Sequence, residues 1–450
     1  MDFRKLDCQY CFARYGSLRF PSATTAAVAA LLLGVSPAFA DDRPNPAARV
    51  QAASKPELAG ALPEGIGVLD RARPEYDAAG LAVGTFILYP TVAAGFSVDD
   101  NVYRTTSAAT ADLFWTISPR LDLRSQWARD RLQVYAQLDD YRYDSYGTEN
   151  RTNWVAGGGG DVLVGPATTV NINASYLGTH ESRTSPDISV QALSPTAYRQ
   201  FHSDATILNQ PASLGLSAGL TFDRYDYDAT LLRGGGLLGN ADRDSNVLEA
   251  FGKASYEFGG GRSVFARASY NVRDFDQTFD RNGFNHNSNG YRIDTGVQAM
   301  FSPLIKGTLF VGYLQQNFKA PLNNVSGIDF GSEIDWYVTE LVTVHLSTAR
   351  ILTNTTLAGA SSEDERSIHA SFDYELLRNV IVQGSLGYEN DIFDGIARRD
   401  HTITAGIETK YLITQQMSLY AGFTHAGRDS NFGAANFSDD IGTAGIRLQY

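Results

Sequence analysis

The sequence is poor in the features that mark several common classes of protein. Its two cysteines, Cys8 and Cys11, both lie in the first 40 residues, so the remaining chain is expected to fold without disulfides. After residue 84 there is no long apolar run, which excludes a membrane protein built from helices. Lysine is scarce beside arginine, and the net charge is −13. A nucleic-acid-binding surface needs a basic stripe, and we find none.

The first 40 residues have the pattern of a secretory signal peptide. A basic beginning that includes Arg4 and Lys5 precedes an apolar core at 26–35, and residues 38–40 (Ala-Phe-Ala) form a cleavage site. The core is too short to span a bilayer. The long basic beginning leaves the true translation start open. Residues 41–83 are rich in Pro, Ala and charge, and we expect them to form a flexible periplasmic segment.

The remainder, residues 84–450, shows the period-2 alternation of β-strands. In its first segment Phe86, Leu88, Val92, Phe96 and Val98 share one face, whereas Thr85, Thr91, Gly95 and Ser97 share the other. The segment ends at the turn signal Asp99-Asp100-Asn101. We count about 18 such segments along the chain, to within about two.

Short and long connections alternate between these segments. Short turns are expected at 129–130, 165–167, 209–211, 259–261, 302–303, 340–341, 378–379 and 415–416. Longer polar loops are expected at 99–111, 144–150, 180–195, 229–244, 276–287, 319–324, 355–363, 391–398 and 428–438. This asymmetry is typical of outer-membrane barrels. The even number of strands places both termini on the same side of the membrane. Because a signal peptide delivers the chain to the periplasm, we expect that side to be the periplasmic one.

A β-sandwich would also alternate, but three features favour a transmembrane barrel. The polar face carries Gly, Ser, Thr and paired charges along nearly every strand. Tyrosine and tryptophan cluster near strand ends, where aromatic girdles meet lipid headgroups. The last strand, 442–450, ends on the aromatic Tyr450 and resembles the signal that the barrel assembly machinery recognises.

The fold prediction follows from the surrounding lipid. Lipid cannot satisfy backbone polar groups, so a spanning sheet must close and its first strand must pair with its last. We therefore predict an all-β fold, a transmembrane antiparallel up-and-down β-barrel of about 18 strands (16–18), embedded in outer-membrane lipid. Pro90 and Pro119 lie inside predicted strands and are interpreted as bulges or strand ends. The glycine run 157–160 lacks the Lys-Ser/Thr of a phosphate loop and indicates a bulge or a close backbone approach.

Two blocks of sequence carry a family resemblance. The first consists of Arg71, Arg73, Pro74, Tyr76 and Asp77, then Gly84, Phe86, Leu88 and Pro90, then 99–103 (Asp-Asp-Asn-Val-Tyr). The second consists of Tyr198-Arg199 and residues 222–227 (Phe-Asp-Arg-Tyr-Asp-Tyr). Together they resemble a bacterial outer-membrane β-barrel porin family of the porin 2 type. The resemblance implies an association with exopolysaccharide export in Gram-negative bacteria, and it supplies no catalytic residues.

Charged residues on the polar faces are the candidates for a lumen lining. By parity they are Asp122, Arg124, Glu249, Lys253, Arg267, Arg273, Arg292, Asp294, Asp329, Glu333, Asp335, Glu375 and Glu408. They can form a salt-bridged wall, or a pore lining that selects solutes, and the two interpretations are compatible. His345, His369 and Ser347 lie on polar faces, but no hydrolase motif surrounds them and we expect no enzyme. The acidic and asparagine-rich loop 276–289 is interpreted as solvated.

The leading functional prediction is an outer-membrane channel for hydrophilic material, with exopolysaccharide export implied by the resemblance. The alternatives are a general or substrate-specific diffusion porin, and a structural or adhesive barrel with a closed lumen. Expected partners are lipid, the barrel assembly machinery through the strand that ends at Tyr450, and polysaccharide with periplasmic export components. No cofactor and no nucleic acid is expected. The transported substrate, a plugged or open lumen and the oligomeric state stay open.

Overall fold

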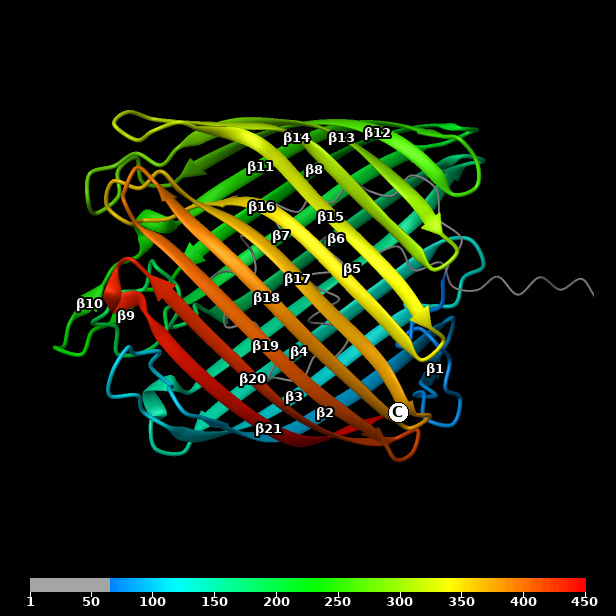
Figure 1. Ribbon diagram of the computed structural model, residues 1–450, viewed down its shortest axis with the longest axis horizontal. Coiled ribbons are helices and arrows are strands. Elements are labelled where there is room, and N and C mark those ends of the chain that lie inside the picture. The colour runs from blue at the N-terminus through cyan, green and yellow to red at the C-terminus, as the bar shows by residue number, and fades with distance from the viewer. Residues whose placement is uncertain (1–64) are drawn as a thin grey trace, which may run out of the picture.

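The computed structural model describes residues 65–450, so the predicted signal peptide lies outside the described residues. As predicted, the chain forms a closed antiparallel barrel of 18 strands, strongly tilted to the barrel axis (Figure 1). The strands of the barrel are β2 (Phe86–Asp99), β3 (Asp112–Ser125), β4 (Arg131–Tyr143), β5 (Arg151–Gly165), β6 (Thr168–His180), β7 (Ala197–Asn209), β8 (Leu214–Tyr227), β11 (Ser245–Glu257), β12 (Arg262–Phe275), β13 (Ser288–Ser302), β14 (Ile305–Phe318), β15 (Val325–Thr339), β16 (Val342–Thr353), β17 (Ser362–Leu377), β18 (Val380–Asp394), β19 (Arg399–Leu412), β20 (Met417–Ser430) and β21 (Phe437–Gln449).

Several short elements are not part of the 18-stranded barrel. They are β1 (Leu81–Val83), the hairpin of β9 (Thr230–Leu231) and β10 (Leu237–Leu238), and the 3₁₀ turns η2 (Gly147–Glu149), η3 (Ala241–Arg243) and η4 (Gly433–Ala435). Among the described residues, no helix has the length and apolar character needed to cross a membrane.

The first and last strands of the barrel pair directly, which confirms the predicted closure. The register runs from Thr91 opposite Gln449 to Asp99 opposite Ile441. Inside this seam, the hydroxyl groups of Ser97 and Thr443 lie 2.8 Å apart and share a hydrogen bond. The beginning of the first strand differs from the prediction. Gly84, at φ +60°, lies in a tight turn between β1 and β2 rather than at the start of a strand.

All eight predicted short turns lie between consecutive strands at one end of the barrel, here called the turn end. The nine longer connections lie at the opposite end, here called the loop end. The loop boundaries agree with the prediction to within a few residues. The largest departure concerns β17 and β18, which extend toward the loop end and include acidic residues that the prediction placed in loops.

The interpretation of Pro90 and Pro119 as bulges or strand ends was wrong. Pro90 pairs with Leu121, and Pro119 pairs with Val92, in an unbroken β2–β3 register. Pro119 instead interrupts the pairing on its other side, where the β3–β4 pairs stop at Ile117 and resume at Arg120 in the same register. Because proline has no N–H group, it leaves a gap in one ladder without inserting a residue.

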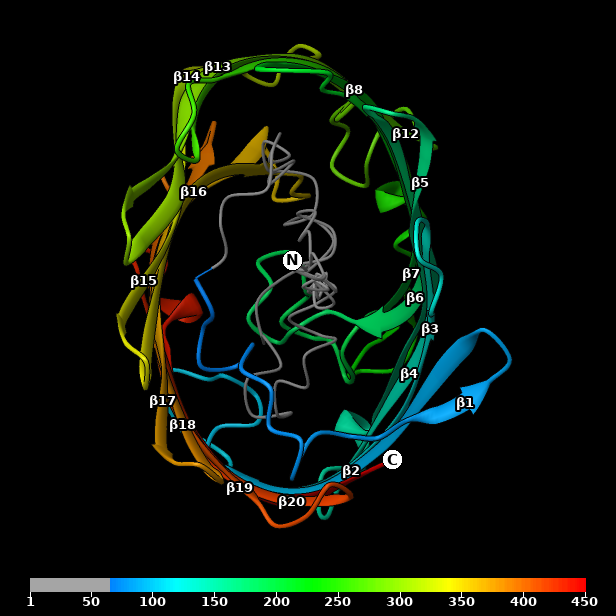
Figure 2. The ribbon, with the colours of Figure 1, turned by 90° about the vertical axis from the view of Figure 1, so that its right-hand side faces the viewer.

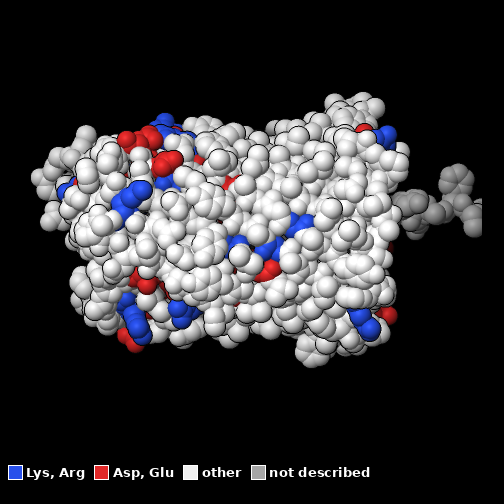
Figure 3. Space-filling view, turned by 90° about the horizontal axis from the view of Figure 1, so that it is seen from above, with Lys and Arg blue, Asp and Glu red and all other residues white. Residues whose placement is uncertain are grey.

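Burial is inverted relative to a water-soluble protein. On the outer face Phe96 and Trp115 are 44% and 55% exposed, whereas Ser97 and Asp122 on the inner face are 1% and 2% exposed. Figure 3 shows charged side chains gathered toward the two ends of the outer surface, with a largely uncharged surface between them and one small charged group near the middle. A large exposed apolar band needs an apolar environment, which a bilayer supplies.

The glycine run 157–160 confirms the predicted close backbone approach. In β5, a Cβ atom added at Gly160 would lie 2.3 Å from the carbonyl oxygen of Arg131 on β4. One added at Gly157 would lie 2.8 Å from the carbonyl oxygen of Ala174 on β6. The bare backbone therefore lets three neighbouring strands pack closely.

Substituting Gly160→Ala is expected to destabilise the barrel by about 1–3 kcal/mol, because the added methyl group overlaps a backbone oxygen that cannot rotate away. The free energy of unfolding in urea, followed by tryptophan fluorescence in lipid vesicles, measures this loss. Gly252→Ala is the matched control, because Gly252 also lies on the outer face of a strand and has no atom within 4 Å of its added Cβ. Equal stability of the two variants would contradict the prediction.

Candidate functional site

The connection from β6 to β7, residues 181–196, crosses the interior of the barrel and is called the crossing loop. Asp187 accepts hydrogen bonds from the hydroxyl of Thr355 (2.8 Å) and the backbone N–H of Thr356 (2.7 Å), between β16 and β17. The guanidinium of Arg428 on β20 donates to the carbonyl of Thr184 (2.7 Å). These partners lie across the ring from β6 and β7, and Figure 2 shows loop segments within the elongated ring of strands. The crossing loop therefore narrows the lumen near the loop end.

Buried ion pairs hold the base of the crossing loop. Glu181 accepts two hydrogen bonds from Arg243 in η3, one of them at 2.8 Å. Arg183 donates to Glu149 at 3.1 Å and stacks over the ring of Tyr103. Burial alone would lower the pKa of Arg243, but Glu181, through its charge and its hydrogen bond, together with Tyr227 and Asp187 raises that pKa well above its usual value. The charge at this anchor is therefore fixed over the whole physiological pH range.

A hollow lies between the crossing loop and the barrel wall. Tyr225, Tyr227 and Phe275 line one side of it. Carboxylates dominate the remainder, and the hollow is called the acidic chamber after them: Glu181, Asp187, Glu363, Glu365, Glu389 and Asp391. Two guanidinium groups, Arg243 and Arg428, also line it. The chamber combines acidic and aromatic groups beside the crossing loop.

Six of the residues predicted to line the lumen lie together on the inner wall from β11 to β15: Glu249, Lys253, Arg267, Arg292, Asp294 and Asp329. Arg267 pairs with Glu249 at 3.2 Å, and Arg292 pairs with Asp329 at 3.5 Å. Lys253 lies over the ring of Phe265. Opposite charges alternate across neighbouring strands, so this part of the wall is an ion-paired network.

The other predicted residues are dispersed around the barrel. Asp122 pairs with Arg124 (2.8 Å) and Arg120, and Arg124 is half-exposed. Asp335 contacts His345 near the turn end, with Glu333 two residues before it on β15. The last three lie far apart. Arg273 donates to the carbonyl of Leu352 near the loop end, and Glu408 is buried on β19. Glu375 forms an ion pair with Arg73 at the turn end. The structure therefore does not bring the set together into one ring.

The histidines of β16 and β17 are arranged for ion pairing. The ring nitrogens of His345 lie 2.6 Å from Asp335 and 3.1 Å from Asp373. Both nitrogens are thus engaged by carboxylates, so His345 has no nitrogen left to activate the hydroxyl of Ser347. His369 lies 3.7 Å from Glu389.

The loop 276–289 is organised by its own side chains. Asp280 is buried and accepts hydrogen bonds from the backbone N–H groups of Asn282 (2.9 Å) and Phe284 (2.8 Å). His286 lies 3.2 Å from the same carboxylate. Arg281 binds Asp242 of the neighbouring loop at 2.8 Å. The sequence had suggested a solvated loop, whereas these contacts show a loop that is packed by its own side chains.

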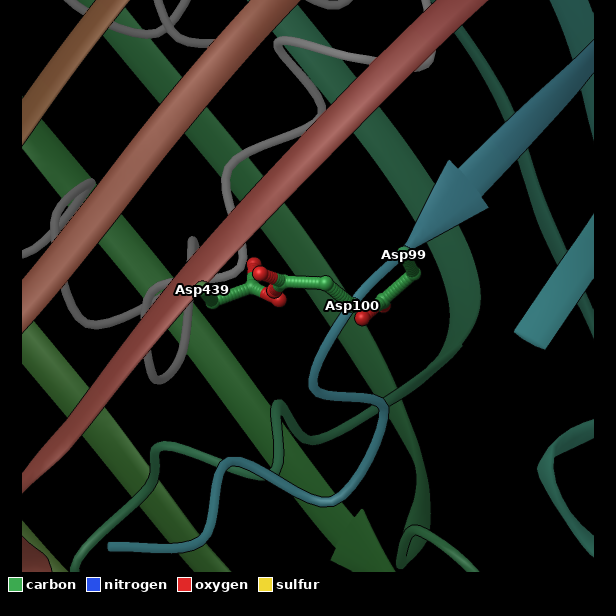
Figure 4. Close-up of side chains that lie close together, drawn as sticks. All are labelled: Asp99, Asp100 and Asp439. Atoms are coloured by element: carbon green, nitrogen blue, oxygen red, sulfur yellow. The ribbon is translucent and has the colours of Figure 1, made fainter. Parts of the chain in front are cut away.

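Three carboxylates at the loop end of the barrel seam lie close enough to hold a cation: Asp99, Asp100 and Asp439 (Figure 4). Their oxygens lie within 4.8 Å of one another. The guanidinium of Arg104 already lies 3.1 Å from Asp99 and 2.8 Å from Asp439. A fixed guanidinium supplies the positive charge that an ion would bring, so the group is interpreted as a salt-bridged seam.

Chelation is accordingly expected to leave the stability of the barrel unchanged. EDTA, added to the refolded protein before urea unfolding, should not move the unfolding midpoint, and neither should added Ca²⁺. The variant Asp100→Asn, which removes the one exposed carboxylate of the group, should respond in the same way. A midpoint that falls with EDTA in the native protein but not in the variant would assign a bound ion here.

Residues 65–77 lie against the inside of the barrel wall at the turn end and are called the N-terminal strap. Val68 is fully buried, and its backbone N–H donates to the hydroxyl of Thr343 at 3.0 Å. Arg73 is buried and pairs with Glu375 on β17 at 2.6 Å. The carbonyl of Pro74 accepts from Gln415. The sequence placed these residues in a flexible segment, whereas the described part makes specific contacts around the rim.

Sequence reasoning missed the acidic chamber for two reasons. The chamber depends on the crossing loop, which was expected to be an outer loop like the others. Two of its carboxylates, Glu363 and Asp391, fell within predicted loops, although Glu363 and Glu365, like Glu389 and Asp391, have the i, i+2 spacing of one strand face. The observed strands are longer than the 9–11 residues that are needed to cross a bilayer. Extending the predicted strands toward the loop end would have placed these carboxylates on one strand face.

Comparisons with known proteins agree with the architecture. A family model described as "Putative beta-barrel porin 2" matches residues 73–450. Similar solved structures include OpdK of Pseudomonas aeruginosa with vanillate (TM-score 0.41, 11% identity, 81% of this chain and 99% of that chain). OccAB3 of Acinetobacter baumannii is also similar (TM-score 0.44, 10% identity, 82% of this chain and 100% of that chain). A search of curated proteins finds no match. The family match extends over the N-terminal strap from Arg73 and over the complete barrel.

Proposed function

Because this chain belongs to the outer-membrane porin family that its family match describes, we propose that it is a diffusion channel for small hydrophilic solutes. Its barrel is an outer-membrane channel fold, and membership of a porin family confirms that it is not an enzyme. The observation that carries the proposal is the crossing loop, which narrows a polar lumen through contacts with the opposite wall. Barrels of this size leave a water-filled interior, and a constriction sets which solutes pass.

Export of an exopolysaccharide is the competing function, implied by the resemblance of the sequence blocks. A polymer would have to thread past the crossing loop, whose Asp187 is bound between Thr355 and Thr356 on the far side. This arrangement favours solutes that diffuse singly. Export would also require periplasmic export components and polysaccharide as partners.

Orientation completes the proposal. The turn end is placed at the periplasm and the loop end outside, because outer-membrane barrels have short periplasmic turns. Both termini then lie on the periplasmic side. The C-terminal strand that ends at Tyr450 is the segment proposed to be recognised during barrel assembly.

Conductance in planar lipid bilayers tests the proposed function. The refolded protein should give discrete steps of ion current in KCl, and uncharged sugars of increasing size should reveal a cutoff by ceasing to lower the conductance. Liposomes carrying the protein should swell in small sugars. A barrel that passes no ions would be a structural one. A gene deletion that abolishes surface polysaccharide and leaves small-solute uptake intact would favour the exporter.

A further inference from the structure

More carboxylates than guanidinium groups line the acidic chamber. Six carboxylates and two guanidinium groups line it, a formal net charge of −4. One guanidinium, Arg243, is committed to Glu181 at 2.8 Å. The other, Arg428, donates to the carbonyl of Thr184 and lies 3.9 Å from Asp400, which is outside the chamber lining. Four of the six carboxylates lie on β17 and β18: Glu363, Glu365, Glu389 and Asp391, and Glu389 lies 3.7 Å from His369.

These four carboxylates are placed where they repel one another. Glu365 and Asp391 are directly opposite in the β17–β18 register. On the same face, Glu363 is diagonal to Asp391 and Glu389 is diagonal to Glu365. Side chains directly opposite in an antiparallel pair lie about 4.5–5.5 Å apart at Cβ, and like charges there destabilise the sheet. Two like charges directly opposite each other lower the stability of the sheet. Features that cost stability in this way are typical of functional sites.

Asp391 is the second and independent observation. It is 5% exposed and lines the hollow, and within residues 65–450 its carboxylate has no hydrogen bond and no ion pair. A buried carboxylate without a partner is costly, since burial removes its hydration. A cationic ligand that enters the chamber would supply the missing partner.

We infer that the acidic chamber is a binding site for multiply charged organic amines, such as linear polyamines, on the path of solutes through the channel. The inference rests on the proposed function and names a substrate class for it. Ammonium groups on a flexible chain can reach several carboxylates that are spread over β17 and β18. The aromatic side of the chamber, which includes Tyr225 and Phe275, suits the methylene groups and charges of such a chain.

The geometry favours an amine over a single metal ion. Ca²⁺ needs several oxygens at about 2.3–2.6 Å, so its ligands must converge on one point. Within the described part of the chain, the group of three carboxylates that converges in this way is Asp99, Asp100 and Asp439 at the seam, and not the chamber.

Block of the ion current by spermidine, a linear triamine, tests the inference. We expect spermidine added to the loop-end side to block the native channel, and the double variant Glu365→Gln/Asp391→Asn to raise the half-blocking concentration by at least about tenfold, because two of the attracting charges are removed. The control is Asp429→Asn, which removes an exposed carboxylate from the outer face of β20 and should leave the block unchanged. Mg²⁺ should block the native channel far more weakly than spermidine.

Three outcomes would overturn the inference: equal block of the native channel and the double variant, equal block by Mg²⁺, or the same loss of block in Asp429→Asn. Both variants should show the heat-dependent gel mobility of a folded barrel. If the native protein passes no current, the proposed function fails, and titration calorimetry of spermidine with the detergent-solubilised barrel decides the inference alone. Binding that is lost in the double variant supports the site, and absence of binding by the native protein refutes it.

Discussion

Shortening the crossing loop is expected to raise the single-channel conductance at least about twofold, because a barrel of this size is wide where no loop fills it. The change replaces residues 182–195 by a short Gly-Ser linker. It removes Asp187 and Thr184, which bind Thr355, Thr356 and Arg428 on the far wall. Conductance and the sugar-size cutoff in planar bilayers measure the result, and both should increase together.

The matched control shortens another loop at the same end without opening the lumen. Residues 234–236 lie at the tip of the β9–β10 hairpin, beside the exposed Leu237, and a Cβ atom added at any of these three glycines would meet no atom within 4 Å. Replacing this tip should leave the conductance unchanged. An intermediate variant, Asp187→Ala, keeps the length of the loop and loses only its distal anchor, so it should give a noisier current. Unchanged conductance after shortening the crossing loop would show that this loop does not set the constriction.

Breaking the ion pair between Arg73 and Glu375 is expected to release the N-terminal strap from the wall. In Arg73→Ala the buried Glu375 loses its closest guanidinium, and removing one partner of a buried pair costs about 3–5 kcal/mol. The carbonyl of Val68 also loses its hydrogen bond from Arg73 (2.8 Å). Hydrogen exchange at the Val68 amide, which donates to Thr343 in the native protein, should become faster by a factor on the order of a hundred or more.

Glu75→Gln is the control for this experiment. Glu75 is exposed and lies 3.9 Å from Arg378, a surface pair worth about 0–1 kcal/mol, so exchange at Val68 should hardly change. The double variant Arg73→Met/Glu375→Leu should recover part of the loss, because an apolar pair leaves no buried charge unpaired. Slow exchange at Val68 in Arg73→Ala would mean that Thr343 and the packing of Val68 hold the strap without the ion pair.

The wall of the barrel was predictable from short-range pattern. Alternation along each strand tells which side chains face lipid, as Phe96 and Val98 show on β2. Turn residues mark where strands reverse, and closure follows because lipid leaves no partner for an open edge. The errors on the wall came from applying local rules too strictly. Pro119 was interpreted as a bulge or a strand end, although a missing donor interrupts one ladder and leaves the strand intact.

The interior was not predictable in the same way. Parity placed Glu249, Arg267 and Glu375 on the inner face, but it could not say which of them meet. Pairing depends on register between strands and on segments that enter from either end. Glu375 pairs with Arg73, 302 residues earlier in the chain, and no spacing in the sequence connects the two.

By itself, the sequence determined that this protein is a closed barrel of 18 strands with an apolar exterior, because side-chain alternation and turn chemistry act within a few residues of each position. Only the tertiary structure decided what the barrel contains. The crossing loop, the acidic chamber and the N-terminal strap depend on contacts such as Asp187 with Thr355 and Val68 with Thr343. These contacts join residues far apart in the chain, and their energies depend on burial, which the closed barrel itself creates.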